Sequence, residues 1–213
     1  KGEPRKQQER DQGPRDEPNK DEAGTDEAGP GQAEQFEETL SAVFAAMQSA
    51  DGSPASAGIV ELLEHASGQA RGPDAKKRVA RWRTLDTYRK GFLDCRRQAL
   101  AAVKAGDEYD VKGRKIAVVE VDDKVFTYRE NGQNKTWATA DLPAGLVLAI
   151  VTSWFDARPA NDLSLGAYHF TKQEPNAVLA REHWEKAAAG AADASSLLPL
   201  LDDPVFTRAI AGE

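Results

Sequence analysis

The sequence predicts an α+β protein in which helices flank one small antiparallel sheet, preceded by a disordered tail. Three observations lead to this prediction. Apolar residues recur at helical spacing before about residue 105 and again after about residue 140. Between these regions lie four short segments that are rich in β-branched and aromatic residues and separated by turn signals. The first 35 residues contain no Val, Ile, Leu, Met, Phe, Tyr or Trp.

The tail, residues 1–35, is an acidic linker by composition. It holds ten acidic and six basic residues, so it carries −4 of the net charge of −7. A segment without large apolar side chains cannot offset the entropy lost on ordering, and we expect it to be disordered. The chain begins at Lys1 without an initiating Met, as expected of the mature part of an exported or tethered protein.

Residues 36–105 are predicted to be helical. The expected helices are Glu34–Ala50, Ser56–Ala66 and a long basic amphipathic helix, Asp74–Lys104. The long helix carries an apolar stripe that we expect to face the core, formed by Val79, Trp82, Leu85, Tyr88, Phe92, Cys95, Ala99 and Val103.

Residues 106–140 are predicted to form a four-stranded antiparallel meander or a small open barrel. The expected strands are Glu108–Lys112, Arg114–Val121, Lys124–Glu130 and Gln133–Thr139. Asn131-Gly132 is a strong hairpin signal, and Lys112-Gly113 and Asp122-Asp123 are the other expected two-residue turns. Counting from these turns predicts two cross-strand rows on one buried face, which are Val119–Phe126–Trp137 and Ala117–Tyr128–Lys135.

Residues 141–213 are predicted to form a C-terminal helical region. Its first helix is expected to start at Asp141 as N-cap, with Pro143 in the first turn, and to cover the sheet. A helical hairpin follows, Asp162–Thr171 and Asn176–Ala189. Short helical pieces are expected at Ser195–Leu201 and after Pro204. The longest apolar run, Ala144–Ile150, is too short to cross a bilayer.

The hairpin resembles a single tetratricopeptide-like repeat. Leu165-Gly166 lies in the first helix, and Ala180, Trp184 and Ala187 have the relative spacing of that family in the second. The resemblance covers about 30 residues, and the rest of the chain resembles no family. It implies a partner-binding role without chemistry, with Gly166 and Tyr168 facing the second helix and exposed positions such as Ser164 or Lys172 facing the partner.

The basic helix is the feature that favours nucleic-acid binding. From Arg71 to Lys104 there are eleven Lys or Arg and three Asp. A nucleic-acid surface would require Arg81, Arg89, Lys90, Arg96 and Arg97 on one open face. Trp82 and Tyr88 fall on the apolar stripe, so we expect them to pack in the core instead of stacking on bases. Nucleic acid is therefore not the expected partner, because the rest of the chain is also acidic.

No residue is assigned a catalytic, cofactor-binding or metal-binding role. His65, His169 and His183 form no metal motif, and a site would require His169 and His183 to meet across the hairpin and recruit a carboxylate. Cys95, the single cysteine, is expected to be a buried structural residue. The acidic pairs Asp122-Asp123 and Asp202-Asp203 are interpreted as turn or cap residues. Asn134-Lys135-Thr136 matches a glycosylation sequon, but it lies on a strand beside a tight turn.

These observations favour a non-enzymatic protein–protein interaction or scaffolding module, tethered to a larger protein. Nucleic-acid binding through residues 74–104 and an enzyme with an unrecognised carboxylate site are the alternatives. The sequence identifies neither the protein partner nor the compartment.

Overall fold

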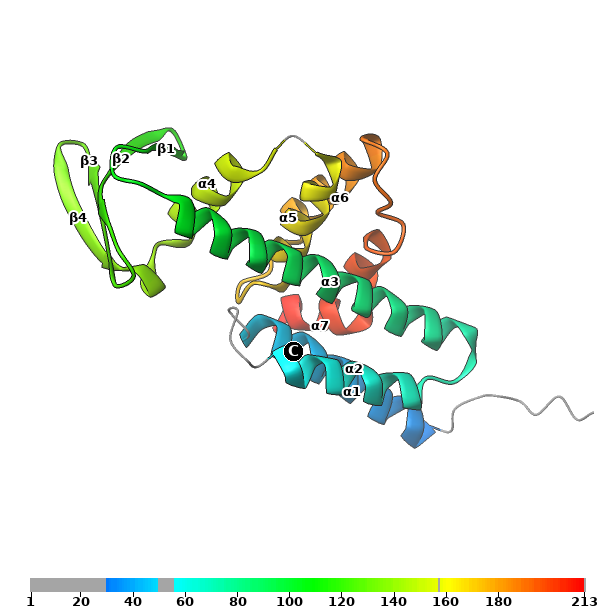
Figure 1. Ribbon diagram of the computed structural model, residues 1–213. Helices are drawn as coiled ribbons and strands as arrows, with labels where there is room; N and C mark the ends of the chain where they lie inside the picture. The colour runs from blue at the N-terminus through cyan, green and yellow to red at the C-terminus, as the bar shows by residue number, and fades with distance from the viewer. Residues whose placement is uncertain (1–29, 50–55, 157, 213) are drawn as a thin grey trace, which may run out of the picture.

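The fold is α+β, as predicted, and Figure 1 shows it as a computed structural model that describes residues 30–49, 56–156 and 158–212. Within these ranges the elements are α1 (Pro30–Ser49), α2 (Ser56–Gln69), α3 (Gly72–Ala102), β1 (Glu108–Val111), β2 (Arg114–Val121), β3 (Val125–Glu130), β4 (Gln133–Ala138), the 3-10 turn η1 (Thr139–Asp141), α4 (Ala144–Trp154), α5 (Pro159–Thr171), α6 (Ala177–Ala189), η2 (Leu198–Asp202) and α7 (Pro204–Ala211). Across these described ranges, no helix has the length and apolar character needed to cross a bilayer.

The first helix starts earlier than the apolar pattern predicts. It begins at Pro30, and residues 31–35 are helical and exposed. Proline suits the first turn of a helix because its missing N–H has no intrahelical partner there. The predicted boundary of the tail at residue 35 is therefore wrong. Residues 1–29, and Ala50 at the other end of this helix, lie outside the described residues.

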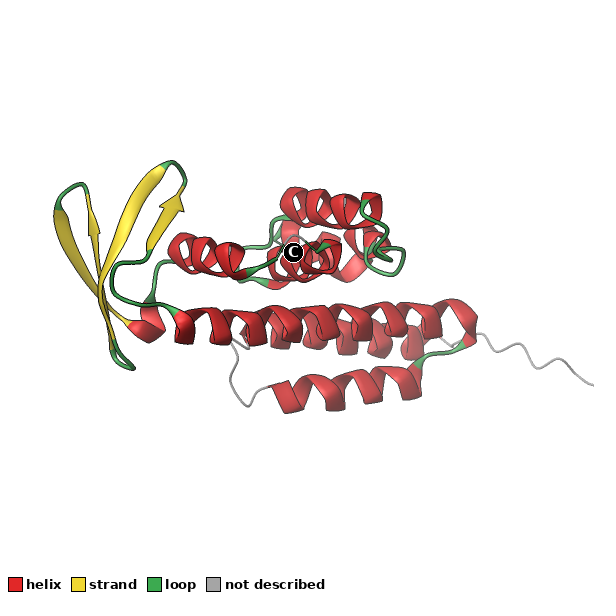
Figure 2. Ribbon diagram, turned by 45° about the horizontal axis from the view of Figure 1, so that its top comes forward, coloured by secondary structure: helices red, strands yellow, loops and turns green. Residues whose placement is uncertain are grey.

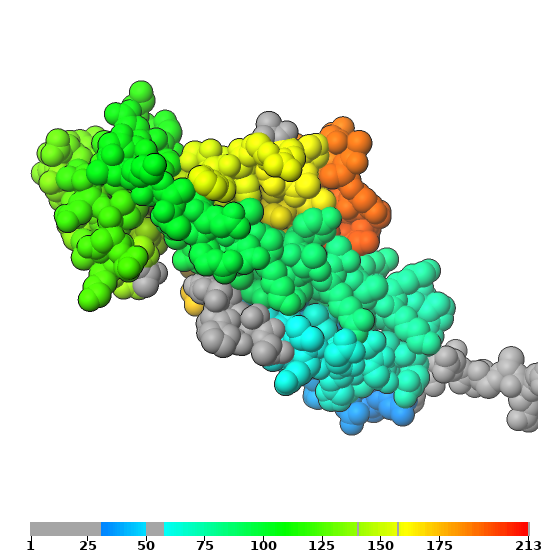
Figure 3. Space-filling view, in the orientation of Figure 1, coloured from blue at the N-terminus to red at the C-terminus, as the bar shows by residue number. Residues whose placement is uncertain are grey.

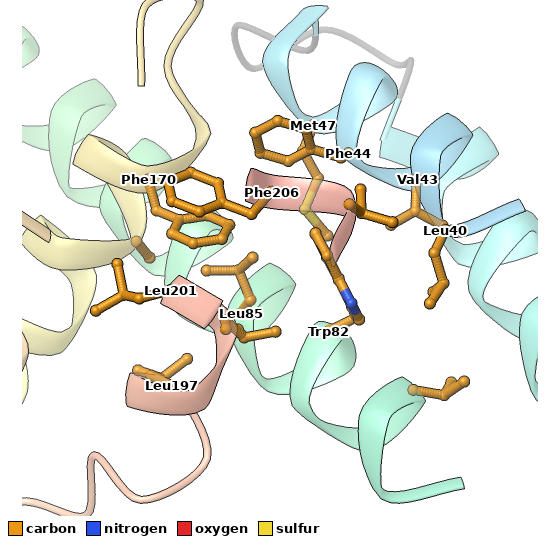
Figure 4. Packing of buried hydrophobic residues seen from close by; sticks show 14 of the residues in the cluster. Leu40, Val43, Phe44, Met47, Trp82, Leu85, Phe170, Leu197, Leu201 and Phe206 are labelled. Atoms are coloured by element: carbon orange, nitrogen blue, oxygen red, sulfur yellow. The ribbon is translucent and has the colours of Figure 1, made fainter. Parts of the chain in front are cut away.

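The larger of two cores joins helices from both ends of the chain. Phe44 of α1 makes edge-to-face ring contacts with Trp82 of α3, Phe170 of α5 and Phe206 of α7, at centroid distances of 5.7 to 5.9 Å. Figure 4 shows these rings converging from separate helices. Phe170 and Phe206 also stack at 3.9 Å. Such aromatic contacts add to the apolar area that each ring buries.

A charged cluster ties α7 to α1 and α3 at the edge of this core. Arg78 of α3 donates to both oxygens of Asp203, at 2.7 and 2.8 Å, and to Glu37 of α1. Arg208 also binds Glu37, at 3.0 Å. Burial lowers the pKa of Arg78, but its hydrogen bonds with Asp203 and Glu37 outweigh burial and raise that pKa above its ordinary value.

The second core lies under the sheet. Phe92 and Val103 of α3, Phe126 of β3 and Ile150 of α4 belong to it. The strands follow the meander order β1-β2-β3-β4, and each neighbouring pair is antiparallel. Figure 2 shows the sheet at one end of α3, with α4 beside it and the N-terminal helices at the other end. The long helix α3 therefore connects both cores.

The predicted cross-strand rows are right between β3 and β4 and wrong in β2. Phe126 pairs with Trp137 and Tyr128 with Lys135. Their partners in β2, however, are Val121 and Val118, and not the predicted Val119 and Ala117.

Two local features cause this shift. The β2–β3 connection is longer than two residues, because Oδ1 of Asp122 accepts from the N–H groups of Lys124 and Val125, both at 2.7 Å. A bulge between Val118 and Glu120 then moves the register back by one residue. The two hairpin turns have the expected backbone, since Lys112-Gly113 and Asn131-Gly132 all have positive φ.

Three further sequence expectations require correction. The N-cap of α4 is Pro143 and not Asp141, because the backbone oxygen of Pro143 accepts from Leu146 and Val147 at 2.9 and 3.1 Å. Cys95 is only half-buried. The α3 stripe also differs in detail, since Tyr88 is half-buried while the charged Asp86 and Arg89 are buried.

Candidate functional site

The outer strand β4 is the most exposed regular element of the sheet. It pairs with β3 on one side, and no described strand pairs with it on the other. All six of its residues are exposed, and none belongs to the core under the sheet. Figure 3 shows the sheet standing at one end of the molecule. In Figure 1, β3 and β4 lie farther from the helical body than β1 does. The strand therefore offers a free edge.

The register identifies which backbone groups point outward from β4. The N–H of Thr139 donates a hydrogen bond to the carbonyl of Lys124 at 2.9 Å. Cross-strand pairs at every second position from there, such as Phe126–Trp137, therefore exchange main-chain hydrogen bonds between β3 and β4. Hydrogen bonding alternates along an antiparallel strand. The remaining residues of β4, which are Asn134, Thr136 and Ala138, therefore direct their N–H and C=O groups away from β3.

Two side chains on the core face of β4, one aromatic and one cationic, determine what this edge can bind. Trp137 is 42 % exposed although it stands opposite the fully buried Phe126. Its predicted burial is wrong, because α3 and α4 do not extend over the outermost strand. Lys135, two residues away on the same face, forms an ion pair with Glu130. Arg114 binds the same carboxylate at 2.7 Å, so the group has a net charge of +1.

The local electrostatics hold Lys135 in place. Its hydrogen bond lowers the pKa of Glu130, aided by the charges of Arg114 and Lys135. The same hydrogen bond raises the pKa of Lys135, which stays protonated at neutral pH. Glu130 is buried, whereas the Lys135 side chain is 46 % exposed. The ammonium group is therefore held by Glu130 of β3, while much of the Lys135 side chain stays open to solvent.

This edge carries little of the usual protection against strand pairing. Edge strands are commonly blocked by Pro, by bulges, by short length, by charged residues, especially Lys, or by an inward-pointing charge. Within β4 there is no Pro, the bulge lies in the interior strand β2, and the one charged residue is Lys135. The strand is six residues long, which is ordinary for a paired strand.

The C-terminal hairpin has the close helix crossing predicted from its small residues. A Cβ at Gly166 would lie 2.3 Å from Nε1 of Trp184, so only glycine fits there. Ala180, Trp184 and Ala187 are fully buried. Tyr168 departs from the prediction, because it stacks on Phe92 of α3 at 4.3 Å instead of facing α6.

The predicted partner-facing side of α5 is covered within this chain. Ser164 is half-buried, and its Oγ lies 3.4 Å from the position of a Cβ at Gly91 in α3. Lys172 is also half-buried, and its carbonyl accepts from Gln48 of α1 at 3.3 Å. Neither residue is the freely exposed position that the sequence predicts.

The two hairpin histidines do meet, together with a carboxylate. The rings of His169 and His183 stack at 5.4 Å with an interplanar angle of 6°. Nδ1 of His183 lies 2.9 Å from Oδ1 of Asp162, which also accepts from Lys186 at 3.0 Å. Nδ1 of His169 is buried without a hydrogen-bond partner. Among the described residues, however, no three His, Cys, Asp or Glu side chains are arranged to hold a metal ion.

The basic helix does not present its five cations on one open face. Arg89 is 3 % exposed, and its Nη2 lies 3.0 Å from Oδ1 of Asp86. Lys90 binds the same carboxylate at 2.7 Å. Trp82 is fully buried, which confirms that it faces the core.

One cavity shows no recognisable catalytic pair among the described residues that line it. It has a volume of about 360 Å³, lies between α1, α3, α4 and α5 and is lined by Arg89, Arg96, Lys172 and Glu174 beside apolar side chains, but by no His, Cys or Ser of the described chain. Cys95 lies outside it. Burial, with the charges of Asp94 and Asp156, raises the pKa of this thiol, which disfavours the reactive thiolate.

The acidic pairs act as turn and cap residues, as interpreted from the sequence. Asp122 closes the β2–β3 connection, and Asp203 caps α7 by accepting from the N–H of Val205 at 3.0 Å. Asn134 of the sequon is exposed, and its side chain accepts from Arg129 at 3.0 Å.

Sequence reasoning located β4 but missed its role as a free edge. The available signal is composition, because Gln133–Ala138 has four consecutive polar residues before Trp137, whereas β2 and β3 carry more apolar residues. Comparison with known proteins adds no assignment, since no protein family, no curated protein and no solved structure matches this chain.

Proposed function

We propose that this chain is a non-enzymatic protein–protein interaction module that docks an extended protein segment along β4. The observation that carries this proposal is the free edge of β4, whose one charged residue, Lys135, is paired with Glu130. An added strand would use the outward N–H and C=O groups of Asn134, Thr136 and Ala138. Main-chain hydrogen bonds supply affinity in this mode of recognition, and side-chain pockets supply specificity.

The side chains of β4 define what the incoming strand should carry. An apolar residue of the incoming strand that lies beside Trp137 would stabilise the complex, because it would cover a large apolar ring that is 42 % exposed. A residue beside Lys135 meets a cluster with a net charge of +1. An acidic or aromatic side chain two residues from an apolar one therefore fits this edge, because same-face residues of a strand are two apart.

Thr136→Pro tests the proposal without removing a main-chain hydrogen bond between β3 and β4, although it removes the hydroxyl contact of Thr136 with Thr127 at 3.1 Å, which Thr136→Val removes as well. The N–H of Thr136 points outward, and proline is tolerated on edge strands when its nitrogen faces solvent. The full chain would be panned against a displayed library of random decapeptides. We expect recovered peptides to lose at least about tenfold in affinity for Thr136→Pro, corresponding to roughly 1.4 kcal/mol.

The matched control is Thr136→Val, which keeps the outward N–H and the preference for strand structure. We expect it to change affinity by less than about twofold. Peptides that bind Thr136→Pro as well as the unchanged chain, while circular dichroism shows the fold intact, would overturn the proposal.

Nucleic-acid binding through the basic helix remains the competing proposal. Oligonucleotide titrations with single-stranded and duplex DNA at near-physiological salt separate the two. We expect at most weak, salt-sensitive binding, because Arg89 is buried and Lys90 shares its carboxylate partner. Micromolar affinity that falls when Arg96 and Arg97 are neutralised would favour the basic helix instead.

A further inference from the structure

We infer that the strand that docks on β4 is β4 of a second copy of this chain, paired antiparallel with Thr136 opposite its own equivalent. This inference rests on the proposed function, because it names the partner of the same edge. It commits to a symmetric dimer whose two sheets join into one sheet of eight strands.

Because only alternate residues of β4 point their N–H and C=O groups outward, two copies of β4 can pair in few ways. The hydrogen-bonded pairs must come from the outward residues Asn134, Thr136 and Ala138. An antiparallel, two-fold arrangement can then be centred on Lys135, Thr136 or Trp137. Only the arrangement centred on Thr136 uses all three outward residues of each copy, whereas either alternative uses two.

Side-chain chemistry selects the same arrangement. Centring on Lys135 places two like charges directly opposite each other, which is unfavourable across strands. Centring on Thr136 places each Lys135 opposite the partner's Trp137, twice in the dimer. Directly opposite side chains in such a pair have Cβ atoms about 5 Å apart, and an ammonium group beside an indole face is attracted to it.

Lys135 and Trp137 both lie on the core face of β4, and both are exposed. Glu130 holds Lys135 on the core face, and the second cation at Glu130, Arg114, keeps the group at a net charge of +1. Trp137 is 42 % exposed on that face and gains cover from the partner strand. On the outer face the pairs are Thr136 with Thr136 and Asn134 with Ala138, which include no like charges.

The shape of the molecule permits this dimer. Figure 1 shows β4 at the outer side of the sheet and the helices on the other side. A two-fold axis at β4 therefore places the helical bodies at opposite ends. The acidic segment 1–29 is a poorer occupant, because it has no large apolar side chain to cover Trp137. Six residues of strand make a small contact, so the dimer should be weak and concentration-dependent.

Cysteine cross-linking tests the pairing and its register in the full chain. In a Cys95→Ser background, which removes the single native thiol, Thr136→Cys places two thiols opposite each other. The expected Cα separation of about 5.5 Å is suitable for a disulfide. We expect diamide to convert most of this variant at high micromolar concentration into a covalent dimer.

Asn134→Cys in the same background is the matched control. Its equivalent in the partner lies four residues along the strand, about 13 Å away, too far for a disulfide. Alone it should stay monomeric, whereas a mixture of Asn134→Cys and Ala138→Cys should cross-link. Equal cross-linking of Asn134→Cys and Thr136→Cys would overturn the register and the inference.

Light scattering on the unmodified chain gives an independent readout. We expect the mass to rise from 23.1 kDa toward twice that value with concentration, and Thr136→Pro to remain at 23.1 kDa. A monomer at millimolar concentration overturns the inference. If displayed peptides still bind in a proline-sensitive manner, the proposed function stands and only the partner is wrong; if neither occurs, both fail. A dimer that Thr136→Pro does not affect also overturns the inference.

Discussion

Acid should destabilise this protein through one buried histidine, His169. Its ring is 4 % exposed, and Nδ1 has no hydrogen-bond partner. Burial, the charge of His183 and the charge of Lys172 lower the pKa of His169 from 6.5 to about 4. Asp162 and Lys186 also face the stacked pair, but they interact with His183.

The direction of the effect follows from the difference between the folded and unfolded states. Between about pH 6.5 and pH 4, the unfolded chain binds a proton at this imidazole and the folded chain does not. The free energy of unfolding must therefore fall as the pH falls through this window, and the loss is complete below the folded pKa. For a single site the loss is about 1.2 kcal/mol at pH 5.5 and about 2.4 kcal/mol at pH 4.5, relative to pH 7.

Urea titrations of the unchanged chain and of His169→Phe isolate this contribution from that of the carboxylates. Phenylalanine keeps a planar ring and removes the titration, so the two stability curves should converge toward neutral pH and separate by about 2 to 3 kcal/mol near pH 4.5. His65→Phe is the matched control, because His65 is exposed. Parallel curves for the unchanged chain and His169→Phe across this window would refute the reasoning.

Five further substitutions test the packing by denaturant titration. Gly166→Ala should cost at least about 1–3 kcal/mol, because its Cβ would lie 2.3 Å from a buried indole nitrogen, and a neutral result would remove the close helix crossing. Phe126→Ala should cost about 3–5 kcal/mol, whereas Trp137→Ala should cost about 1 kcal/mol, so equal losses would contradict the assignment of β4 as an uncovered edge. Asp203→Ala should cost about 2–3 kcal/mol, because it removes one of the two carboxylates that bind the Arg78 guanidinium and leaves the Trp82 indole N–H without its acceptor, while the exposed Asp202→Ala should cost less than about 0.5 kcal/mol.

Local patterns predicted the elements and their type because they depend on neighbouring residues. The helical spacing around Phe44 and Trp82 and the turn at Asn131-Gly132 correspond to observed helices and a hairpin. Each signal lies within a few residues, where backbone preference and side-chain period act. The four-stranded meander followed from the β-branched and aromatic segments together with the turn signals between them.

The candidate site exists because β4 is the outer strand of the sheet and its residues are exposed. The alternation that places Trp137 on the same face as Phe126 was readable from the sequence. The sequence contains no comparable signal for the reach of α3 and α4 over the sheet, so the exposure of Trp137 could not be predicted. The bulge at Val118 and the longer connection at Asp122 were also missed, since each depends on hydrogen bonds that form only in the paired sheet.

The sequence by itself determined the helices, the strands, the two tight turns at Lys112-Gly113 and Asn131-Gly132, and the small residues of the C-terminal hairpin. Only the tertiary structure decided that the first and last helices share a core through Phe44 and Phe206, and that His169 meets His183. It also decided that β4 lies at the outer edge. The physical reason is range, because periodicity and turn chemistry act between near neighbours, whereas burial and free edges depend on segments that are far apart in the chain.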